Sequence, residues 1–572
     1  MVWPSIQNNK TRKPTSWHSW VFVFCAYLLE IIVPLHMHII AYAISFCNIF
    51  LSYFLFTQVF TNSSSILLAT LFHLMYICNN TFEKGEVPMA AHNLTLLTDL
   101  YQLTMMQGYF KNKDQNETVI FDAFYRSNPQ DSGYAISAGL EQIIEYIKNL
   151  RFTKDDIDYL ESLHIFEKDF LDYLESFHFS GDIYAIPEGS VMFPREPMIK
   201  VIAPIMEAQL IETAILNIMN HQSLIATKAS RVCYAAKGDG IMEFGLRRAQ
   251  GPDAGLYGAR AAMIGGCIGT SNVLAGQLFD VPVKGTHAHS WIMSFPDEYT
   301  AFKTYAQMYP DSCTLLVDTY DTLQSGVPNA IRVFQEMKEA GIKPKFYGIR
   351  LDSGDLAYIS KKARKMLDDA GFTDAVISAS NDLDEFLIDS LKAQGATITS
   401  WGVGTHLITS KDCPSFGGVY KLAAIMKEDG TFIPKIKLSE NTEKVTNPGN
   451  KTIYRIYDKE SGKIKADLIC LVDDVFDINK PLMLFDPAEP WKKTKLMPGT
   501  YTMKELLVPV FLKGECVYES PSVMDIRAFC QQELNTLWDE VRRLVNPHKV
   551  HVDLSPRLYD MKIALLDQLG ER

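Results

Sequence analysis

The sequence predicts an α/β fold in which an irregular barrel of parallel strands is joined to an α+β domain. The first observation is a series of short apolar runs separated by helical patterns, as strand–helix repeats require. These runs start at residues 241, 281, 314, 346, 375 and 398. Because only about six such units are visible, fewer than the eight of a regular barrel, the barrel is expected to be irregular. The second observation is a change after about residue 422, beyond which apolar and polar residues alternate.

At 572 residues the chain is too long for a single hydrophobic core. Residues 206–424 are predicted to form the barrel. Residues 89–205 and 425–572 are predicted to combine into one discontinuous α+β domain. Within the α+β domain, helical periodicity is expected at 94–110, 139–150, 154–177 and 525–545, and strands at 119–126, 432–438, 452–457 and 465–472. Residues 205–236, at the start of the barrel segment, are expected to form one long helix or two abutting ones.

Residues 1–88 form a hydrophobic N-terminal extension with a different composition. Apolar runs cover 20–35, 39–60 and 65–78, and the middle run is long enough to span a bilayer. One interpretation is a membrane anchor of one to three passes. The other, which we favour, is that translation starts at Met89 and the upstream stretch is foreign to the working protein. Contact with a membrane is therefore expected only if residues 20–78 belong to the protein, and a cytosolic location is expected otherwise.

Charge and cysteine content narrow the class of protein. The formal net charge is −12; residues 1–88 carry four basic and three acidic residues, net +1, so the remainder is near −13. An acidic body argues against a nucleic-acid partner, which needs a broad basic face. A small anionic substrate needs only a few focused cations. The ten cysteines contain no C-x-x-C pair, so buried thiols in a reducing compartment are expected rather than a zinc site or disulfides.

Polar residues follow the predicted strands, and in a parallel barrel the carboxyl ends of the strands share one face, where active sites form. Arg350-Leu-Asp352-Ser-Gly-Asp355 combines a cation with two carboxylates. Arg350 can grip an anion, while Asp352 and Asp355 can orient it or hold Mg²⁺ on a pyrophosphate. The alternative is a structural Arg–Asp pair with a helix N-cap. Gly402-Val-Gly404-Thr405 can cradle a phosphate with backbone N–H groups, or it is simply a glycine turn.

Three further strand ends leave alternatives open. His287 and His289 lie two residues apart, which suits a metal pair, a single catalytic or phosphate-accepting histidine, or a structural histidine. Arg247 and Arg248 repel one another, which favours an anion between or beside them over a bland surface pair. Asp382 suits the hydroxyls of a ribose, or it caps a helix together with Asn381.

Together these motifs resemble the nicotinate phosphoribosyltransferase family, and the resemblance covers nearly all of residues 93–560. Several long motifs in one order make a chance match improbable. The segments that carry the resemblance are 97–105, 244–251 with Gly255, 271–276, 285–290, 350–355, 380–382, 402–405 and 446–455.

The resemblance implies a type II phosphoribosyltransferase fold that works as a homodimer with a site shared between subunits. The implied reaction joins nicotinate to 5-phosphoribosyl-1-pyrophosphate, giving nicotinate mononucleotide and pyrophosphate. ATP is implied as co-substrate, with its hydrolysis coupled to the reaction. This is the first step of NAD salvage from nicotinic acid. Mg²⁺ or Mn²⁺ is implied as cofactor, carried with pyrophosphate rather than by a fixed protein cage, with Asp352 or Asp355 as possible contacts.

The resemblance also implies roles for individual residues. His289 matches the residue that is transiently phosphorylated, and Arg350 and Asp352 join it as catalytic residues. Tyr101, from the opposite subunit, and Phe244 match aromatic residues that stack on the pyridine ring. The remaining implied contacts are Thr286 and Arg350 for nicotinate, Arg247 for the phosphoribosyl substrate or pyrophosphate, Asp382 for the ribose, and Gly404 with Thr405 for the 5′-phosphate.

The substrate is expected to be the acid rather than the amide. Relatives that act on nicotinamide carry an acidic residue in the segment that corresponds to residues 269–272, where this chain has only neutral groups, Ser271 among them. An Asp there would repel a carboxylate. A phosphoribosyltransferase for nicotinamide or another pyridine remains the alternative. A membrane protein that only binds ligand is a second alternative, against which His289, Arg350 and Thr405 argue together.

Overall fold

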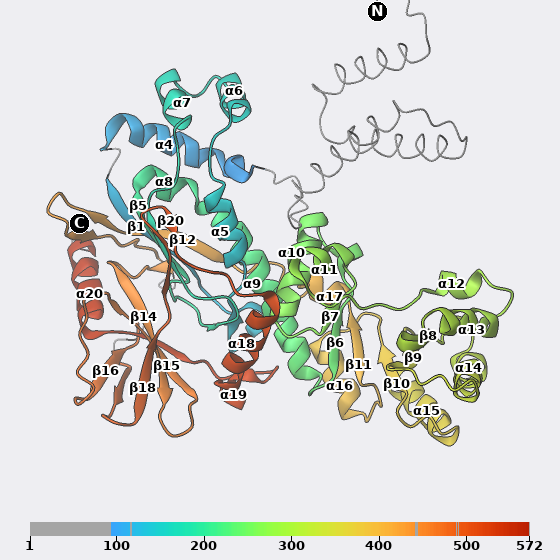
Figure 1. Cartoon of the computed structure of the whole chain (residues 1–572). Coiled ribbons are helices and arrows are strands. Elements are labelled where there is room, and N and C mark those ends of the chain that lie inside the picture. Colours follow the sequence, from blue (N-terminus) through green and yellow to red (C-terminus); the bar gives the residue numbers. More distant parts are fainter. Residues whose placement is uncertain (1–92, 115–116, 441–443, 488, 490, 571–572) are drawn as a thin grey trace, which may run out of the picture. The chain divides into compact units, whose positions relative to one another are not determined.

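The computed structural model describes residues 93–114, 117–440, 444–487, 489 and 491–570 (Figure 1). The apolar runs predicted between residues 20 and 78 lie outside the described residues. Within the described part, no helix is both long and apolar enough to cross a bilayer.

Six parallel strands form the sheet that carries the strand-end motifs, which confirms the predicted fold class (Figure 1). Their order in the sheet is β7, β6, β11, β10, β9, β8. If the two edges are joined into a ring, this is the order of the strands along the sequence, as in the wall of a barrel. Every adjacent pair is parallel. The strands are β6 (Gly240–Glu243), β7 (Gly269–Thr270), β8 (Cys313–Leu316), β9 (Tyr347–Leu351), β10 (Val376–Ala379) and β11 (Ser400–Val403).

The strand predicted at residue 281 is reduced to an isolated parallel bridge between Val283 and Thr270. Pro282 has no N–H to donate to a ladder, which limits pairing here. The same segment reaches the opposite edge of the sheet, where the Nε2 atom of His287 accepts a hydrogen bond from the backbone N–H of Leu316 at 3.4 Å. Residues 283–287 therefore join the two edges, β7 and β8, and the barrel is irregular at this point.

Helices alternate with the parallel strands, and their inner faces are buried against the sheet. The largest fully buried side chain is Trp401 on β11, which belongs to the same core as Phe302 and Phe334 on two of these helices. The helices are α10 (Pro252–Ile264), α11 (Val273–Phe279), α12 (His289–Met293), α13 (Glu298–Met308), α14 (Val327–Glu339), α15 (Leu356–Asp369), α16 (Glu385–Ala393) and α17 (Thr405–Ile408).

A seven-stranded sheet combines strands that lie before and after the barrel in the sequence. Its strongest pairing joins β1 and β12 over seven residue pairs, so chain segments about 300 residues apart lie side by side. The boundaries predicted at residues 205 and 425 stay predictions. The sheet consists of β13 (Phe432–Pro434), β12 (Gly418–Met426), β1 (Thr118–Tyr125), β5 (Ile199–Pro204), β3 (Asp182–Ala185), β19 (Val508–Leu512) and β20 (Glu515–Cys516).

A six-stranded sheet near the C-terminus contains the predicted alternating strands as β14 and β15, which pair antiparallel. A two-stranded sheet joins β2 (Ala135–Ile136) to β4 (Val191–Met192). The six strands are β17 (Lys493–Leu496), β16 (Leu482–Phe485), β21 (His551–Leu554), β15 (Ile464–Leu471), β14 (Lys451–Asp458) and β18 (Tyr501–Glu505), and the C-terminal helix α20 (Pro556–Gly570) packs on β15 and β16.

Several predicted helices are divided. The helix predicted at 154–177 is interrupted near a left-handed His164 (φ 55°): the first helix ends at Ser162 and the second begins at Lys168. The one predicted at 205–236 is two abutting helices, as one of the stated alternatives held. The helices of this half are η1 (Leu94–Leu96), α4 (Leu100–Asn112), α5 (Leu140–Lys148), α6 (Lys154–Ser162), α7 (Lys168–Leu174), α8 (Ile205–Leu210), α9 (Glu212–Ala235), α18 (Val523–Asn535) and α19 (Asp539–Arg542).

Candidate active site

Arg350 is the centre of the site at the carboxyl ends of the parallel strands. It lies on β9, and its guanidinium donates hydrogen bonds to Ser380 Oγ at 2.8 Å and to Thr286 Oγ1 at 2.8 Å. Its Nη2 also donates to Asp352 Oδ1 at 3.1 Å. The Arg350 side chain is only 16% exposed. The structure thus brings together Thr286, Ser380 and the Arg350–Asp352 pair, which come from three separate segments of the sequence.

His289 lies beside this group as the first residue of α12. Its Nδ1 is 3.1 Å from Thr319 Oγ1. Its Nε2 faces two carboxylates, 3.7 Å from Asp352 Oδ2 and 3.9 Å from Asp318 Oδ1. The side chain is 40% exposed, so the ring is reachable from solvent while its orientation is set by neighbours on two segments, residues 318–319 and Asp352.

Asp318 is a site residue that the sequence did not single out. Its Oδ2 accepts hydrogen bonds from the backbone N–H of Asp352 and from Ser353 Oγ, both at 2.7 Å. The Asp318 side chain is 1% exposed, and its Oδ1 has no hydrogen-bond partner among the described residues. The only signal in the sequence was the position of Asp318 after β8.

Two acidic residues from the predicted set stand apart from the Arg350 group. Asp355 caps α15 by accepting from the backbone N–H of Tyr358 at 3.0 Å, so both parts of the structural alternative, the Arg350–Asp352 pair and the helix cap, are present. Asp382 is exposed, next to Asn381 with φ 107°. The predicted capping by Asn381 or Asp382 is wrong, because Asp384 caps the following helix instead.

Phe244 follows β6 and lies against β11. Its backbone N–H donates to Val403 O at 2.8 Å, and a Cβ added to Gly402 would lie 2.5 Å from its ring Cδ2. The Phe244 ring can therefore lie at this end of the sheet only because residue 402 is a glycine and has no side chain. Arg247 and Arg248 follow on a short 3-10 turn, and both side chains are exposed.

Ser271 lies at the end of β7, half-buried, and its backbone N–H donates to Glu243 O at 3.0 Å. The buried Glu243 side chain accepts from Thr270 Oγ1 at 2.6 Å. Burial raises the pKa of Glu243, which its hydrogen bonds to Thr270 and Gly245 partly offset. This carboxyl ties β6 to β7 beneath Ser271.

His287 is a structural histidine. The side chain is buried, its Nε2 accepts from Leu316 N–H, and its ring meets the edge of Tyr305 with centroids 4.7 Å apart. Burial lowers the pKa of His287 to about 4, so the ring is neutral at physiological pH. The metal-pair alternative for His287 and His289 is not supported, because the Nε2 lone pair of His287 already accepts the hydrogen bond from the backbone N–H of Leu316.

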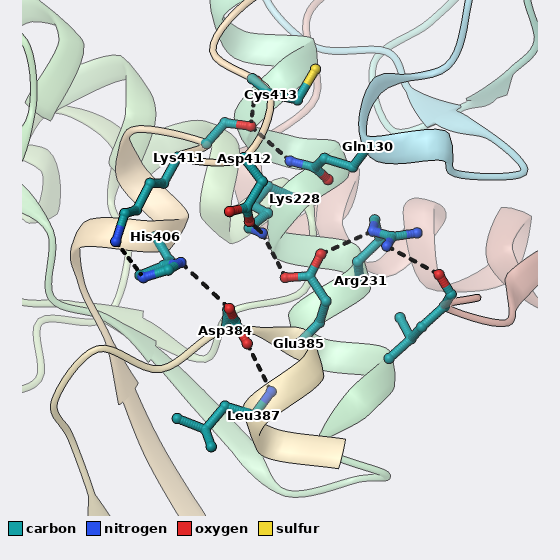
Figure 2. A network of polar contacts seen from close by, with 12 residues as sticks. Gln130, Lys228, Arg231, Asp384, Glu385, Leu387, His406, Lys411, Asp412 and Cys413 are labelled. Atoms are coloured by element: carbon teal, nitrogen blue, oxygen red, sulfur yellow. Dashed lines mark hydrogen bonds and ion pairs between the residues drawn. The ribbon is translucent and has the colours of Figure 1, made fainter. Parts of the chain in front are cut away.

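Gly404 is the N-cap of α17 and Thr405 is its first residue, and a network of charged residues lies around His406, the next residue of this helix (Figure 2). Next to Thr405, His406 lies with Nδ1 3.5 Å from Asp384 Oδ2 and Nε2 3.1 Å from Lys411 Nζ. On the same side, the fully buried Lys228 pairs with Asp412 at 3.0 Å and with Glu385 at 2.6 Å.

Three groups in this network, Asp384, His406 and Asp412, have ligand atoms within 4.8 Å of one another, close enough to suit a metal ion. The ammonium groups of Lys228 and Lys411 already occupy that space as donors (Figure 2). The hydrogen bond from Lys228 also lowers the pKa of Asp412. We interpret the group as a charge network that holds the Gly404–Thr405 turn.

Tyr101 is not brought to the Arg350 group. It lies on α4, which packs on α8, and its side chain is 49% exposed. The predicted contribution of Tyr101 to the site of a second copy stays a prediction.

Most of the described chain matches one protein family. Residues 96–220 match the nicotinate phosphoribosyltransferase N-terminal domain, 240–444 the nicotinate phosphoribosyltransferase family, and 450–562 the C-terminal domain of the same enzyme. The chain is 48% identical over 480 residues to the nicotinate phosphoribosyltransferase of Bacillus subtilis, covering 84% of this chain and 96% of that one. It is 37% identical over 544 residues to that of Dictyostelium discoideum, covering 85% and 90%.

Solved structures agree with these matches. The crystal structure of human nicotinic acid phosphoribosyltransferase superposes with a TM-score of 0.71 at 30% identity, over 83% of this chain and 100% of that one. A nicotinate-nucleotide pyrophosphorylase from Pyrococcus furiosus shares the fold, with a TM-score of 0.60 at 22% identity over 79% and 98% of the two chains.

Proposed function

The chain belongs to the nicotinate phosphoribosyltransferase family, and on that premise we propose that it joins nicotinate to 5-phosphoribosyl-1-pyrophosphate. The products are nicotinate mononucleotide and pyrophosphate, and the reaction is coupled to ATP hydrolysis through a phosphohistidine. This reaction is the first step of NAD salvage from nicotinic acid, in the cytosol.

The observation that carries this proposal is the arrangement around Arg350. Four oxygen acceptors, on Thr286, Asp352, Ser380 and the backbone carbonyl of His287, fix the guanidinium at the strand ends while one Nη2 N–H remains for a ligand. Such a fixed cation with a free N–H suits the carboxylate of nicotinate. The half-buried ring of Phe244 offers a face on which the pyridine can stack.

The chemistry needs no strong base, because the pyridine nitrogen already has a lone pair. Its attack forms the N–C1 bond as the bond from C1 to the pyrophosphate oxygen breaks, and the electron pair leaves with pyrophosphate. Positive charge builds on the ribose and negative charge on the leaving group. The exposed Arg247 is the cation that would stabilise the leaving oxygens, and electrostatic stabilisation of this kind is usually the largest catalytic contribution.

His289 is suited to accept a phosphoryl group from ATP through Nε2. If Nδ1–H donates to Thr319 Oγ1, the lone pair lies on Nε2, which is the nitrogen that faces Asp318 and Asp352. Attack of Nε2 on the γ-phosphorus forms the N–P bond and breaks the bond to ADP. In a later step water attacks the phosphorus, the N–P bond breaks with its electron pair returning to Nε2, and phosphate is released. The added charge then positions the substrate phosphates.

Mg²⁺ or Mn²⁺ fits the residues beside His289. Oδ1 of Asp318 is buried without a hydrogen-bond partner among the described residues, and Oδ2 of Asp352 lies on the same side of the ring. Carboxylate oxygens are the ligands these cations prefer. Asp318 and Asp352 would hold the ion, and Asp355 would not, since it caps α15. When bound, the ion would neutralise charge on the phosphates.

We propose that two copies share each site through Tyr101. Tyr101 lies in an exposed apolar group on and before α4, with Leu97 39%, Leu100 54% and Met105 37% exposed, which suits burial against a second copy. Tyr101→Ala and Arg350→Gln should each be nearly inactive alone. Because half of the dimers in a re-equilibrated mixture then hold one intact site, activity should return to about a quarter of wild type. No recovery on mixing, with dimers present by sedimentation, contradicts the shared site.

The test of the activity itself is a rate assay with competing bases. The full chain and residues 89–572 are each supplied with 5-phosphoribosyl-1-pyrophosphate, ATP and either nicotinate or nicotinamide. The expected result is product with nicotinate and nicotinate-dependent phosphate release from ATP. Product only with the amide supports the alternative substrate, and no product with either base from a folded protein refutes the proposal.

A further inference from the structure

A small pocket lies between the seven-stranded sheet and the C-terminal sheet. Residues of β1, of the 445–447 segment, of β14 and of α20 line it, and no residue of the parallel strands does. Its water-accessible volume is about 20 Å³. That is more than one water molecule needs and far less than a nucleotide needs.

The charged groups that line this pocket are out of balance. Three cations, Arg195, Lys451 and Lys562, face one carboxylate, Asp122. Asp122 pairs with Lys451 at 2.7 Å, so Arg195 and Lys562 have no carboxylate partner among the residues that line the pocket. Within the described residues, both hydrogen-bond partners of Lys562 Nζ are neutral oxygens, Asn447 Oδ1 at 3.0 Å and Pro487 O at 3.2 Å.

These charges are held away from water. Lys562 is 5%, Lys451 2% and Asp122 4% exposed, and buried cations are rare unless they are paired. Burial, together with the positive charge of Arg195, lowers the pKa of Lys562 to about 8. Two acidic residues outside the lining act in the opposite direction. The charge of Asp486 raises the pKa of Lys562, and the charge of Glu505 raises the pKa of Lys200, a neighbour of Lys451.

Two more features point to a ligand. Arg195 has φ 76°, a conformation that residues other than glycine rarely adopt and that recurs at ligand clamps. Its side chain has no hydrogen bond or ion pair within the described part of the chain. Oδ1 of Asp122 is also buried with no hydrogen-bond partner there. The pocket therefore offers free cationic donors and one free acceptor.

We propose that this pocket binds one tetrahedral phosphate between Arg195 and Lys562, as inorganic phosphate or as the phosphoryl group of a small ester. The guanidinium and ammonium groups donate to the phosphate oxygens, and the hydroxyl of Thr446 lies in the same lining. A protonated phosphate oxygen donates to the free Oδ1 of Asp122. Sulfate has no proton to donate at neutral pH, so Asp122 repels it and the site selects phosphate.

The site is separate from the proposed function and is tested without it. The full chain is titrated with sodium phosphate, with sodium sulfate at equal ionic strength, and with ribose 5-phosphate, and its Tm is recorded. Phosphate is expected to raise Tm in a saturable way and sulfate is not. A response to the ester as well as to phosphate identifies the phosphoryl group as the ligand. A response to phosphate alone identifies the free ion. A flat response to both overturns the proposal.

Variants locate the site that responds. Arg195→Asn keeps a residue that tolerates positive φ and removes the charge, while Lys562→Gln keeps a donor for Asn447. Each should raise the half-saturating phosphate concentration at least about tenfold, as expected for loss of a charged hydrogen bond. Lys480→Gln, at a side chain 78% exposed, is the matched control and should leave it unchanged.

A phosphate response that survives Arg195→Asn but disappears in Arg350→Gln places the ion at the strand ends and overturns the pocket. Asp122→Asn should allow sulfate to raise Tm as phosphate does. Should Asp122→Asn or Lys562→Gln not fold, crystals of the wild-type chain soaked in tungstate decide the matter. An anomalous peak between Arg195 and Lys562 supports the site, and its absence there with peaks elsewhere refutes it.

Discussion

Arg350 on β9 donates a hydrogen bond to Thr286 Oγ1 at 2.8 Å across the mouth of the parallel sheet, although 64 residues separate the two in the sequence. The contact exists because residues 283–287 join the two edges of the sheet and hold Thr286 above β9. The guanidinium is thus oriented before any substrate arrives, which lowers the cost of binding a carboxylate.

Arg350→Gln should weaken the binding of nicotinate. Loss of a charged hydrogen bond costs about 1.5–3 kcal/mol, so KM for nicotinate should rise roughly 10- to 100-fold. The measurement is the initial rate against nicotinate concentration at saturating 5-phosphoribosyl-1-pyrophosphate. Arg332→Gln, at a side chain 60% exposed, is the control. An unchanged KM in a variant that keeps the wild-type Tm contradicts the role of Arg350.

His289→Ala should separate ATP hydrolysis from product formation. The variant has no imidazole to accept the phosphoryl group, so nicotinate-dependent phosphate release should fall to background while some nicotinate mononucleotide still forms without ATP. Because the side chain is 40% exposed, the free energy of unfolding should change by less than about 0.5 kcal/mol. The readouts are phosphate and nucleotide from one reaction, with the exposed His178→Ala as control. Coupled hydrolysis that persists in His289→Ala rules the phosphohistidine out.

Ser271→Asp should move the preference from acid toward amide. Ser271 lies at the end of β7, above the buried Glu243, so a new carboxylate there is oriented by the strand rather than free in solvent. It would repel the carboxylate of nicotinate and accept from the amide of nicotinamide. The measurement is kcat/KM for nicotinate divided by kcat/KM for nicotinamide. This ratio should fall by at least about tenfold, which corresponds to roughly 1.4 kcal/mol. A ratio that does not move would falsify the specificity argument.

Much of the parallel sheet could be predicted from the sequence, because each strand is a short apolar run that ends in polar residues. The clustering of Thr286, Arg350 and Asp352 followed from the rule that such ends share a face. The role of Asp318 was not predicted, because it depends on the pairing of β8 with β9, which places the Asp318 carboxylate beside the backbone N–H of Asp352. A residue that binds backbone through tertiary register leaves no local pattern.

Helix ends and distant contacts were predicted least well. The division of 154–177 depends on one left-handed residue, His164, and histidine carries no clear signal for that conformation. The strand predicted at 281 shrank to a bridge because Pro282 interrupts it. The place of Phe244 against Gly402 joins segments 158 residues apart in the chain, so only the assembled barrel reveals why position 402 needs a glycine.

His287 should make stability depend on pH below neutrality. Its pKa is lowered from 6.5 unfolded to about 4 folded by burial, so the unfolded chain binds the extra proton first. The stabilisation is complete above pH 6.5 and is lost as pH falls from 6.5 to 4, to an extent on the order of 3 kcal/mol. His287→Gln has no such titration, so the difference in unfolding free energy between wild type and variant should shrink over that range in urea titrations. A difference that stays constant contradicts the assignment.

Gly402→Ala should damage the nicotinate site without touching a substrate directly. The new Cβ would lie 2.5 Å from Cδ2 and 2.6 Å from Cε2 of Phe244, far inside contact distance, so the ring must move. Because Phe244 is the proposed stacking surface, KM for nicotinate should rise at least about tenfold, since an aromatic pair contributes roughly 0.5–1.5 kcal/mol beyond burial and the displaced ring also obstructs the mouth.

The comparison that isolates this effect uses a second glycine of the same chain. Gly285→Ala adds a Cβ with no atom within 4 Å, close to Thr286 in sequence, and should leave KM for nicotinate near wild type. KM for 5-phosphoribosyl-1-pyrophosphate should change less than that for nicotinate in Gly402→Ala, because Gly404 and Thr405 are held by the network of His406 and Asp384. Equal losses for both substrates would instead show that the Cβ distorts β11 as a whole, and that Phe244 has no separate role.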